Sequence, residues 1–208
     1  MPNFVINKLT ISGDKKHTEK VEKFFSDSEG NMEFSFEKFI PVPSDLENAV
    51  SGCLTHYIMR YLENPSPSNR KDVIDASTPY LGMAKKDMSF EDIISEYESN
   101  LMKFGVTTSH SWKLNKWGCK WDASNSVFSG NDGKYTFYFK TPWTSPFEAI
   151  LYLSNLLVNC TLYLEYADEN LGYNCGCLKL ENGLIKEDIK EDSAQFGKEL
   201  WDEFYSHF

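Results

Sequence analysis

The residues from Trp112 to Trp121 combine aromatic rings with positive charge. These ten positions hold three tryptophans, three lysines and no acidic residue. Indole rings can stack on planar ligands and ammonium groups can neutralise phosphates, so this composition is typical of a site for a nucleotide or a single nucleic-acid strand. The candidate ligand-binding residues are Trp112, Lys113, Lys116, Lys120 and the nearby Trp143.

The same stretch is also typical of a strand that packs one face against the core. In an extended segment over 117–122, Trp117 and Trp121 would point to one side, and Lys116 and Lys120 to the other. Burying one indole ring contributes about 2–3 kcal/mol to folding, which is a sufficient reason for tryptophans at these positions. The alternation favours this structural interpretation, and the ligand-binding alternative stays open.

Two further groups have the residue types of a reaction centre. Cys119, His110 and Asp122 could serve as nucleophile, base and orienting acid, although Cys119 lies on the expected core face. A predicted turn carries acidic residues that suit acid–base chemistry or a divalent cation, but a solvated turn is the simpler explanation. These acidic residues are Glu165, Asp168 and Glu169. The sequence holds no G-x-S-x-G, no H-E-x-x-H and no phosphate-binding glycine loop, so we expect no catalytic residues, no metal and no cofactor.

The overall composition restricts the class of protein. The chain has 208 residues and a formal net charge of −10. General coating of nucleic acid needs a basic surface, so we do not expect that role, whereas an acidic surface suits solubility or a basic protein partner. Five scattered cysteines without a C-x-x-C pair predict reduced thiols in the cytoplasm. No stretch approaches about 18 consecutive apolar residues, so we expect no membrane span.

The periodicity of the apolar residues predicts the elements that must position these groups. Strands are expected over 4–12, 32–39, 117–122, 134–140, 160–166 and 172–180. The Asn131-Asp132-Gly133 sequence predicts a hairpin turn. Two helices are expected over 14–27 and 145–158, the second with Ser145 as its N-cap and Pro146 in its first turn.

Residues 44–110 have a different pattern from the two ends of the chain. Ser89 and Asp92 form a capping-box sequence, and apolar residues at helical spacing follow, so we expect a helix over 89–105. The acidic C-terminal segment predicts a helical tail at about 181–208. The order of elements predicts a single α+β domain over 1–208. We expect a ferredoxin-like antiparallel sheet with helices on one face, a helical insertion at about 44–110 and a C-terminal helix.

Several segments of the chain resemble the YubB ferredoxin-like family, whose members are small proteins carried by bacteriophages and conjugative plasmids. These segments are MPNFVINKLTISG, FSFEKFIPVPSDL, NKWGCKWDA, TPWTSPFEAI and LEYADENLGY. The most specific matches are W-G-x-K-W-D from Trp117 to Asp122 and W-x-x-P from Trp143 to Pro146. The resemblance covers both ends of the chain but not residues 50–105. It implies a ferredoxin-like fold and a mobile-element origin, and it supplies no catalytic residues.

These observations together predict a non-enzymatic accessory protein of a phage or plasmid. We expect it to bind and inhibit a host defence component, such as a CRISPR-Cas effector, in the cytoplasm of a bacterial host. Its partner would be a host protein or nucleoprotein complex, and the oligomeric state stays open. The candidate partner-binding residues are Glu187, Asp188, Glu191, Asp192 and Trp201. The alternatives are a small-ligand or nucleotide-binding protein that uses residues 112–121, and an enzyme with an unmarked active site.

Overall fold

The computed structural model describes residues 3–47, 53–81, 88–131, 133–191 and 193–208. The chain forms two compact units. The larger unit contains Met1–Pro41 and Leu114–Phe208, and the smaller unit contains Val42–Lys113.

The larger unit is built on an antiparallel sheet of six described strands in the order β2-β3-β1-β4-β5-β6. The strands are β1 (Phe4–Ser12), β2 (Ser124–Asn131), β3 (Lys134–Pro142), β4 (Thr161–Asp168), β5 (Cys175–Glu181) and β6 (Leu184–Lys190). With its helices this sheet confirms the predicted α+β fold. The predicted strands over 4–12, 134–140, 160–166 and 172–180 correspond to β1, β3, β4 and β5. The predicted turn at 131–133 includes Asp132, which lies outside the described residues.

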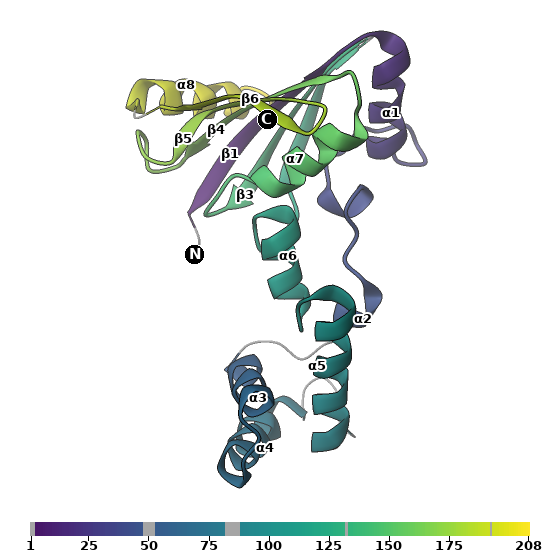
Figure 1. The fold of residues 1–208 in the computed structure, drawn as a ribbon. Helices are drawn as coiled ribbons and strands as arrows, with labels where there is room; N and C mark the ends of the chain where they lie inside the picture. Colours follow the sequence, from purple (N-terminus) through teal and green to yellow (C-terminus); the bar gives the residue numbers. More distant parts are fainter. Residues whose placement is uncertain (1–2, 48–52, 82–87, 132, 192) are drawn as a thin grey trace. The chain divides into compact units, whose positions relative to one another are not determined.

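Helices cover the two faces of the sheet differently (Figure 1). Helices α1 (Lys15–Phe25) and α7 (Phe147–Leu156) lie on one face, which we call the α7 face. There the rings of Phe25 and Phe137 are 5.0 Å apart, and those of Phe147 and Tyr166 are 5.1 Å apart. Helix α8 (Ala194–Tyr205) covers the opposite face. Its apolar residues pack on a cluster from β1, β3, β4 and β5 that includes Ile6, Tyr138, Ala167 and Cys175.

The strand predicted over 32–39 was wrong. Apart from an isolated bridge at Met32, this segment contains only a short 3-10 helix, η1 (Phe36–Lys38). The N–H groups of Phe34 and Phe36 bond to side chains instead of a neighbouring strand. The Phe34 N–H donates to the Ser126 hydroxyl at 2.9 Å, and the Phe36 N–H donates to the Asp122 carboxylate at 2.6 Å. Phe34 and Phe36 alternate in the sequence because both rings are buried, and not because the segment pairs with a strand.

The strand predicted over 117–122 was also wrong. Helix α6 (Ser109–Trp117) extends to Trp117, and Gly118 follows it with a left-handed φ of 79°. Because the segment is not extended, Trp117 and Trp121 do not share a face. Trp117 is fully buried, whereas Trp121 is 46% exposed. The first part of the predicted helical tail differs too, because residues 184–190 form β6 at one edge of the described sheet.

The smaller unit is helical in its described residues. It contains α2 (Ser44–Glu47), α3 (Cys53–Glu63), α4 (Pro67–Leu81), α5 (Phe90–Phe104) and the first part of α6. Its core is a cluster of buried side chains: Leu54, Ile58, Val73, Ile93, Ile94 and Tyr97. The predicted capping box of Ser89 and Asp92 is confirmed, and Gly105 caps the other end of α5 with a φ of 70°. Within the described ranges, no helix is long and apolar enough to cross a membrane.

Candidate ligand-binding site

The W-G-x-K-W-D segment connects α6 to the sheet through contacts that its residue types explain. The indole N–H of Trp117 donates to the Ile40 carbonyl at 2.9 Å, which pairs its polar atom inside the core. At Gly118 the backbone is left-handed, and a Cβ atom would lie 2.0 Å from a carboxylate oxygen of Glu148. Glycine therefore satisfies both a conformational and a steric requirement at this position.

Cys119 and Asp122 are occupied by contacts within the protein. The Cys119 thiol is buried and donates to the Trp121 carbonyl at 3.2 Å. Burial raises its pKa to about 12, so the nucleophilic thiolate is scarce at neutral pH. Asp122 accepts hydrogen bonds from the Ser35 hydroxyl at 2.5 Å and from the Phe36 N–H, which holds the 35–36 backbone in place. His110, the third residue of this hypothetical set, belongs to the smaller unit.

Lys120 lies between two exposed tryptophans. Its ammonium nitrogen is 4.0 Å from the ring centroid of Trp121 and 4.0 Å from that of Trp143. Both indole rings are about half exposed, at 46% and 52%. The structure therefore brings together two of the predicted ligand-binding residues, Lys120 and Trp143, and adds Trp121, which the sequence had assigned to the core.

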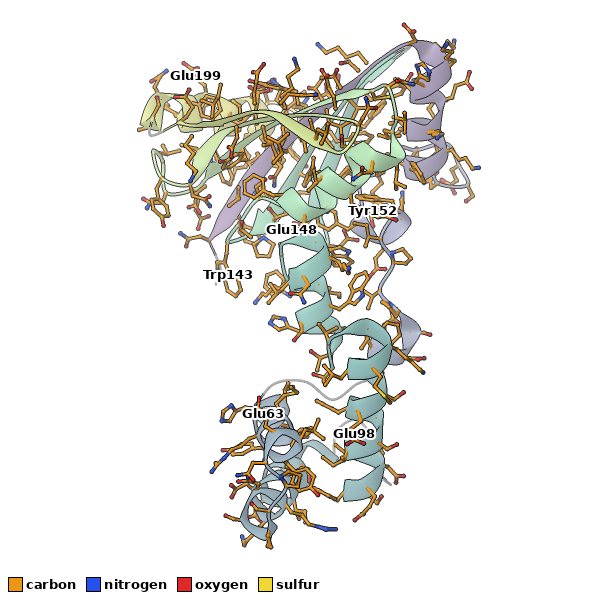
Figure 2. The ribbon with its side chains drawn as sticks, in the orientation of Figure 1. Glu63, Glu98, Trp143, Glu148, Tyr152 and Glu199 are labelled. Atoms are coloured by element: carbon orange, nitrogen blue, oxygen red, sulfur yellow. The ribbon has the colours of Figure 1, made fainter. Side chains whose placement is uncertain are left out.

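The backbone of Trp143 has a conformation that bulky residues rarely adopt. Its φ is 65°, in the left-handed region, where a Cβ-bearing side chain is strained by about 1–3 kcal/mol. Two hydrogen bonds hold the residue there. The Trp143 N–H donates to the Asn3 carbonyl at 2.9 Å, and the Asn174 amide donates to the Trp143 carbonyl at 3.2 Å. Trp143 follows β3 directly, at the end of the sheet, with its side chain projecting from it (Figure 2).

A buried polar network supports this turn from the core side. Asn7 has no exposed surface, and its amide donates to the Thr141 hydroxyl at 2.9 Å. The Ser145 hydroxyl donates to the Asn7 amide oxygen at 2.6 Å, and the Thr141 hydroxyl donates to the Thr144 carbonyl at 2.7 Å. Satisfied buried networks make the local geometry rigid. Ser145 is thus a network residue, and the predicted role as N-cap of α7 was wrong, since the cap position is Pro146.

A cavity of about 350 Å³ lies beside Trp143. Its lining residues are Trp143, Tyr166, Tyr173, Asn174, Cys175 and Lys190. Burial raises the pKa of Tyr166, so its hydroxyl is neutral at physiological pH. Among the described lining residues, Lys190 is the one basic side chain and none is acidic, and no described residue forms an ion pair with Lys190. Together with Lys120 and Trp121, the exposed and half-buried members of this lining form a surface that we call the Trp143 site: Lys120, Trp121, Trp143, Tyr173, Asn174 and Lys190.

A second cavity, of about 430 Å³, adjoins the first on the α7 face and shares Tyr166, Asn174 and Lys190 with it. Its other lining residues come from α7, β5 and β6: Phe147, Glu148, Leu151, Leu178, Leu180, Ile185 and Asp188. This cavity is more apolar and carries two carboxylates, Glu148 and Asp188. The two cavities therefore differ in charge.

The remaining predicted ligand residues lie elsewhere. Trp112 is buried and belongs, like Lys113, to the smaller unit. Lys116 is an exposed residue of α6. Among the residues missed by the sequence, Tyr173 and Asn174 follow Gly172 in a turn, and no pattern within that turn links it to Trp143.

The predicted partner-binding residues are divided between a strand and the core. Glu187 and Asp188 lie on the exposed strand β6, and Glu191 follows it, while Asp192 lies outside the described residues. Trp201 is a buried residue of α8, and its indole N–H donates to the Asp168 carbonyl at 3.1 Å. Trp201 therefore supports the fold of the larger unit.

Of the predicted acidic group, Glu165 and Asp168 lie within β4, and only Glu169 follows the strand. Glu165 pairs with Lys8 at 3.4 Å, and the buried Asp168 accepts the Asn170 N–H at 2.8 Å. Across the described parts of the chain, no group of three or more His, Cys, Asp or Glu side chains could hold a metal ion.

Comparison with known proteins identifies a related domain. Residues 116–206 match the family model described as a ferredoxin-like domain in Api92-like protein. None of the curated proteins matches the chain. The crystal structure of a protein Api92 from Yersinia pseudotuberculosis is similar, with a TM-score of 0.51 and 11% sequence identity. That match covers 91% of this chain and 98% of the Yersinia chain, and at such low identity it establishes the fold alone. The chain is thus similar in fold to Api92, and its residues 116–206 match the ferredoxin-like domain of Api92-like proteins.

Proposed function

We propose that this chain is a non-enzymatic binding protein that recognises a partner macromolecule through the Trp143 site. The observation that carries the proposal is the backbone of Trp143. Its left-handed φ of 65° is unfavourable for tryptophan, yet hydrogen bonds with Asn3 and Asn174 hold the residue in place while it is 52% exposed. Strain that folding does not require is typical of functional sites.

The composition of the Trp143 site supports recognition. Exposed tryptophan and tyrosine dominate the energetics of many interfaces, because they bury a large area with few rotatable bonds. Trp121, Trp143 and Tyr173 are 46%, 52% and 66% exposed. Lys120 and Lys190 add positive charge to this surface, although the chain carries a net charge of −10. The site therefore has aromatic anchors and a local charge opposite to that of the whole protein.

The contacts of Cys119 and Asp122, two described residues of the hypothetical reaction centre, support a role without catalysis. The Cys119 thiol has a raised pKa of about 12, and Asp122 is engaged by the 35–36 backbone. The expected partner is a host defence component, such as a CRISPR-Cas effector, in a bacterial cytoplasm. This expectation rests on the resemblance to the mobile-element YubB family.

The test compares three proteins in a bacterial host with an active CRISPR-Cas system. Wild type, Trp143→Ala and Tyr152→Ala are expressed, and survival of a targeted phage or plasmid is scored together with affinity capture of the partner. Tyr152 is a matched control because it is 45% exposed on α7 and lines neither cavity (Figure 2). We expect wild type and Tyr152→Ala to protect and Trp143→Ala to lose about tenfold or more in survival.

Two results would contradict the proposal. Equal protection by wild type and by a folded Trp143→Ala variant would exclude the Trp143 site as the contact surface. Turnover of nucleotides or nucleic acid by the purified wild-type protein would exclude a purely binding role.

A further inference from the structure

We propose that the cavity beside Trp143 binds one nucleotide, with its base against the aromatic residues and its phosphate at Lys190. This inference deepens the proposed function, and it names the chemistry that the Trp143 site recognises. A free nucleotide and an unpaired nucleotide of a single strand offer the same chemistry.

The lining of the cavity matches both parts of such a ligand. Trp143, Tyr173 and Tyr166 supply aromatic surface, and Lys190 supplies an ammonium group. Aromatic side chains stack with any base, since every base has a π-face, and lysine binds phosphate as a point charge. The volume of about 350 Å³ lies within the range of small-molecule sites, about 300–1,000 Å³.

The charged side chains around the two cavities indicate where the phosphate of the ligand would bind. Lys190 also lines the adjoining cavity, but there two carboxylates, Glu148 and Asp188, oppose its single ammonium group and would repel an anion. Among its described lining residues, the smaller cavity has Lys190 as its one basic side chain and no carboxylate, and Lys120 lies on the ring of Trp143. Neither lysine forms an ion pair with a described residue, so both ammonium groups can attract a phosphate. The anionic end of the ligand is therefore favoured in the smaller cavity.

The net negative charge of the protein limits its contact with a nucleic-acid strand to a few nucleotides. A chain of net charge −10 repels an extended polyanion, so only the nucleotides near Lys120 and Lys190 are attracted. Because the salt dependence of binding follows the number of phosphates neutralised, we expect the shallow dependence of one or two contacts.

The experiment titrates the full chain with nucleoside 5′-monophosphates, the corresponding nucleosides, and an eight-residue single-stranded oligonucleotide. Binding is followed by tryptophan fluorescence and by calorimetry. We expect the monophosphates to bind more tightly than the nucleosides. Tighter binding of the oligonucleotide than of the monophosphates would identify a strand as the source, and equal or weaker binding would identify the free nucleotide.

Variants separate the two halves of the ligand. Lys190→Gln should weaken binding of the monophosphate by about tenfold and leave binding of the nucleoside unchanged. Lys186→Gln, on the same exposed strand but outside both cavities, should change neither. Trp143→Ala should weaken binding of both ligands by about tenfold or more. Thermal unfolding of each variant checks that it is folded.

The results distinguish this inference from the proposed function. No binding of any probe to folded wild type, or equal weakening by Lys190→Gln and Lys186→Gln, would overturn the nucleotide site. Loss of partner capture by Trp143→Ala would still support the proposed function in that case. If the wild type binds nucleotides but Trp143→Ala does not change capture of the partner, the nucleotide site is supported and the proposed function is contradicted.

Discussion

The ammonium nitrogen of Lys120 lies 4.0 Å from the ring centroid of Trp143. The two residues come from different parts of the chain, Lys120 from the segment after α6 and Trp143 from the turn after β3. Their contact joins the W-G-x-K-W-D segment to the W-x-x-P segment. The two most specific sequence features of the chain therefore belong to one surface.

Lys120→Met should have a small effect on stability. Cation–π contacts at exposed sites contribute about 0.5–1 kcal/mol each, and Lys120 contacts two exposed rings. We expect a loss of about 1 kcal/mol in the free energy of unfolding, measured by urea denaturation. Lys120→Arg keeps the charge and should lose less than Lys120→Met. Equal losses for both variants would show that the charge over the rings is unimportant.

Trp117 and Trp121 should respond very differently to truncation. Trp117→Ala removes a fully buried ring and its bond to Ile40, so we expect a loss of about 3–5 kcal/mol. Trp121→Ala removes a ring that is 46% exposed, and we expect a loss of about 1 kcal/mol or less. Denaturation curves of the two variants measure this difference. Equal losses would support the predicted extended strand, in which both rings are buried.

Trp143→Gly should be more stable than Trp143→Ala. Alanine keeps the Cβ atom and therefore the strain at a φ of 65°, whereas glycine adopts this φ readily. We expect glycine to be favoured by about 1 kcal/mol in thermal or urea unfolding. Both variants should lose binding, because both lack the ring. A less stable glycine variant would indicate that the turn is not strained.

The docking of α8 should depend on pH through Glu203. Partial burial alone would raise the pKa of Glu203, but hydrogen bonds from Lys8 and Tyr138 outweigh it and hold the pKa below the ordinary 4.5. The carboxylate of Glu203 accepts both bonds, at 2.9 Å and 2.7 Å. A lowered folded-state pKa gives stability that is complete above the unfolded-state pKa. This stability is lost as the pH falls through the folded-state value.

The measurement compares melting temperatures of wild type and Glu203→Gln from pH 7 to acid. We expect wild type to be more stable at pH 7, and the difference to shrink as the pH falls below about 4.5. Glu199→Gln, on the exposed side of the same helix, is the control and should show little change. A difference that stays constant with pH would mean that the Glu203 charge does not stabilise the docked helix.

Local sequence patterns were sufficient for much of the sheet and its helices. The alternation over 4–12 matches β1, and the segment over 134–140 lies within β3. The capping box of Ser89 and Asp92 correctly placed the start of α5. These elements are predictable because their signals, the alternation of side chains and the bonding of a helix end, lie within a few residues of one another.

Three segments were predicted wrongly because a distant partner decides their backbone. Phe34 and Phe36 alternate as in a strand, but their N–H groups bond to Ser126 and Asp122. Around Trp117 the bond to Ile40 and the approach of Glu148 to Gly118 end a helix where alternation had suggested a strand. The exposed residues of β6 pair with β5, although their dense charges resemble a helical tail.

The sequence by itself determined the antiparallel ferredoxin-like framework, the acidic net charge, and the importance of the tryptophans and lysines near residue 120. Only the tertiary structure decided which of them meet. The sequence cannot show that Asn3 and Asn174 hold Trp143 in a left-handed backbone, because these residues are far apart in the chain. The position of Lys120 between Trp121 and Trp143 likewise depends on how the turn after β3 is supported from the core. Such contacts arise from the packing of complete elements, and no local pattern encodes them.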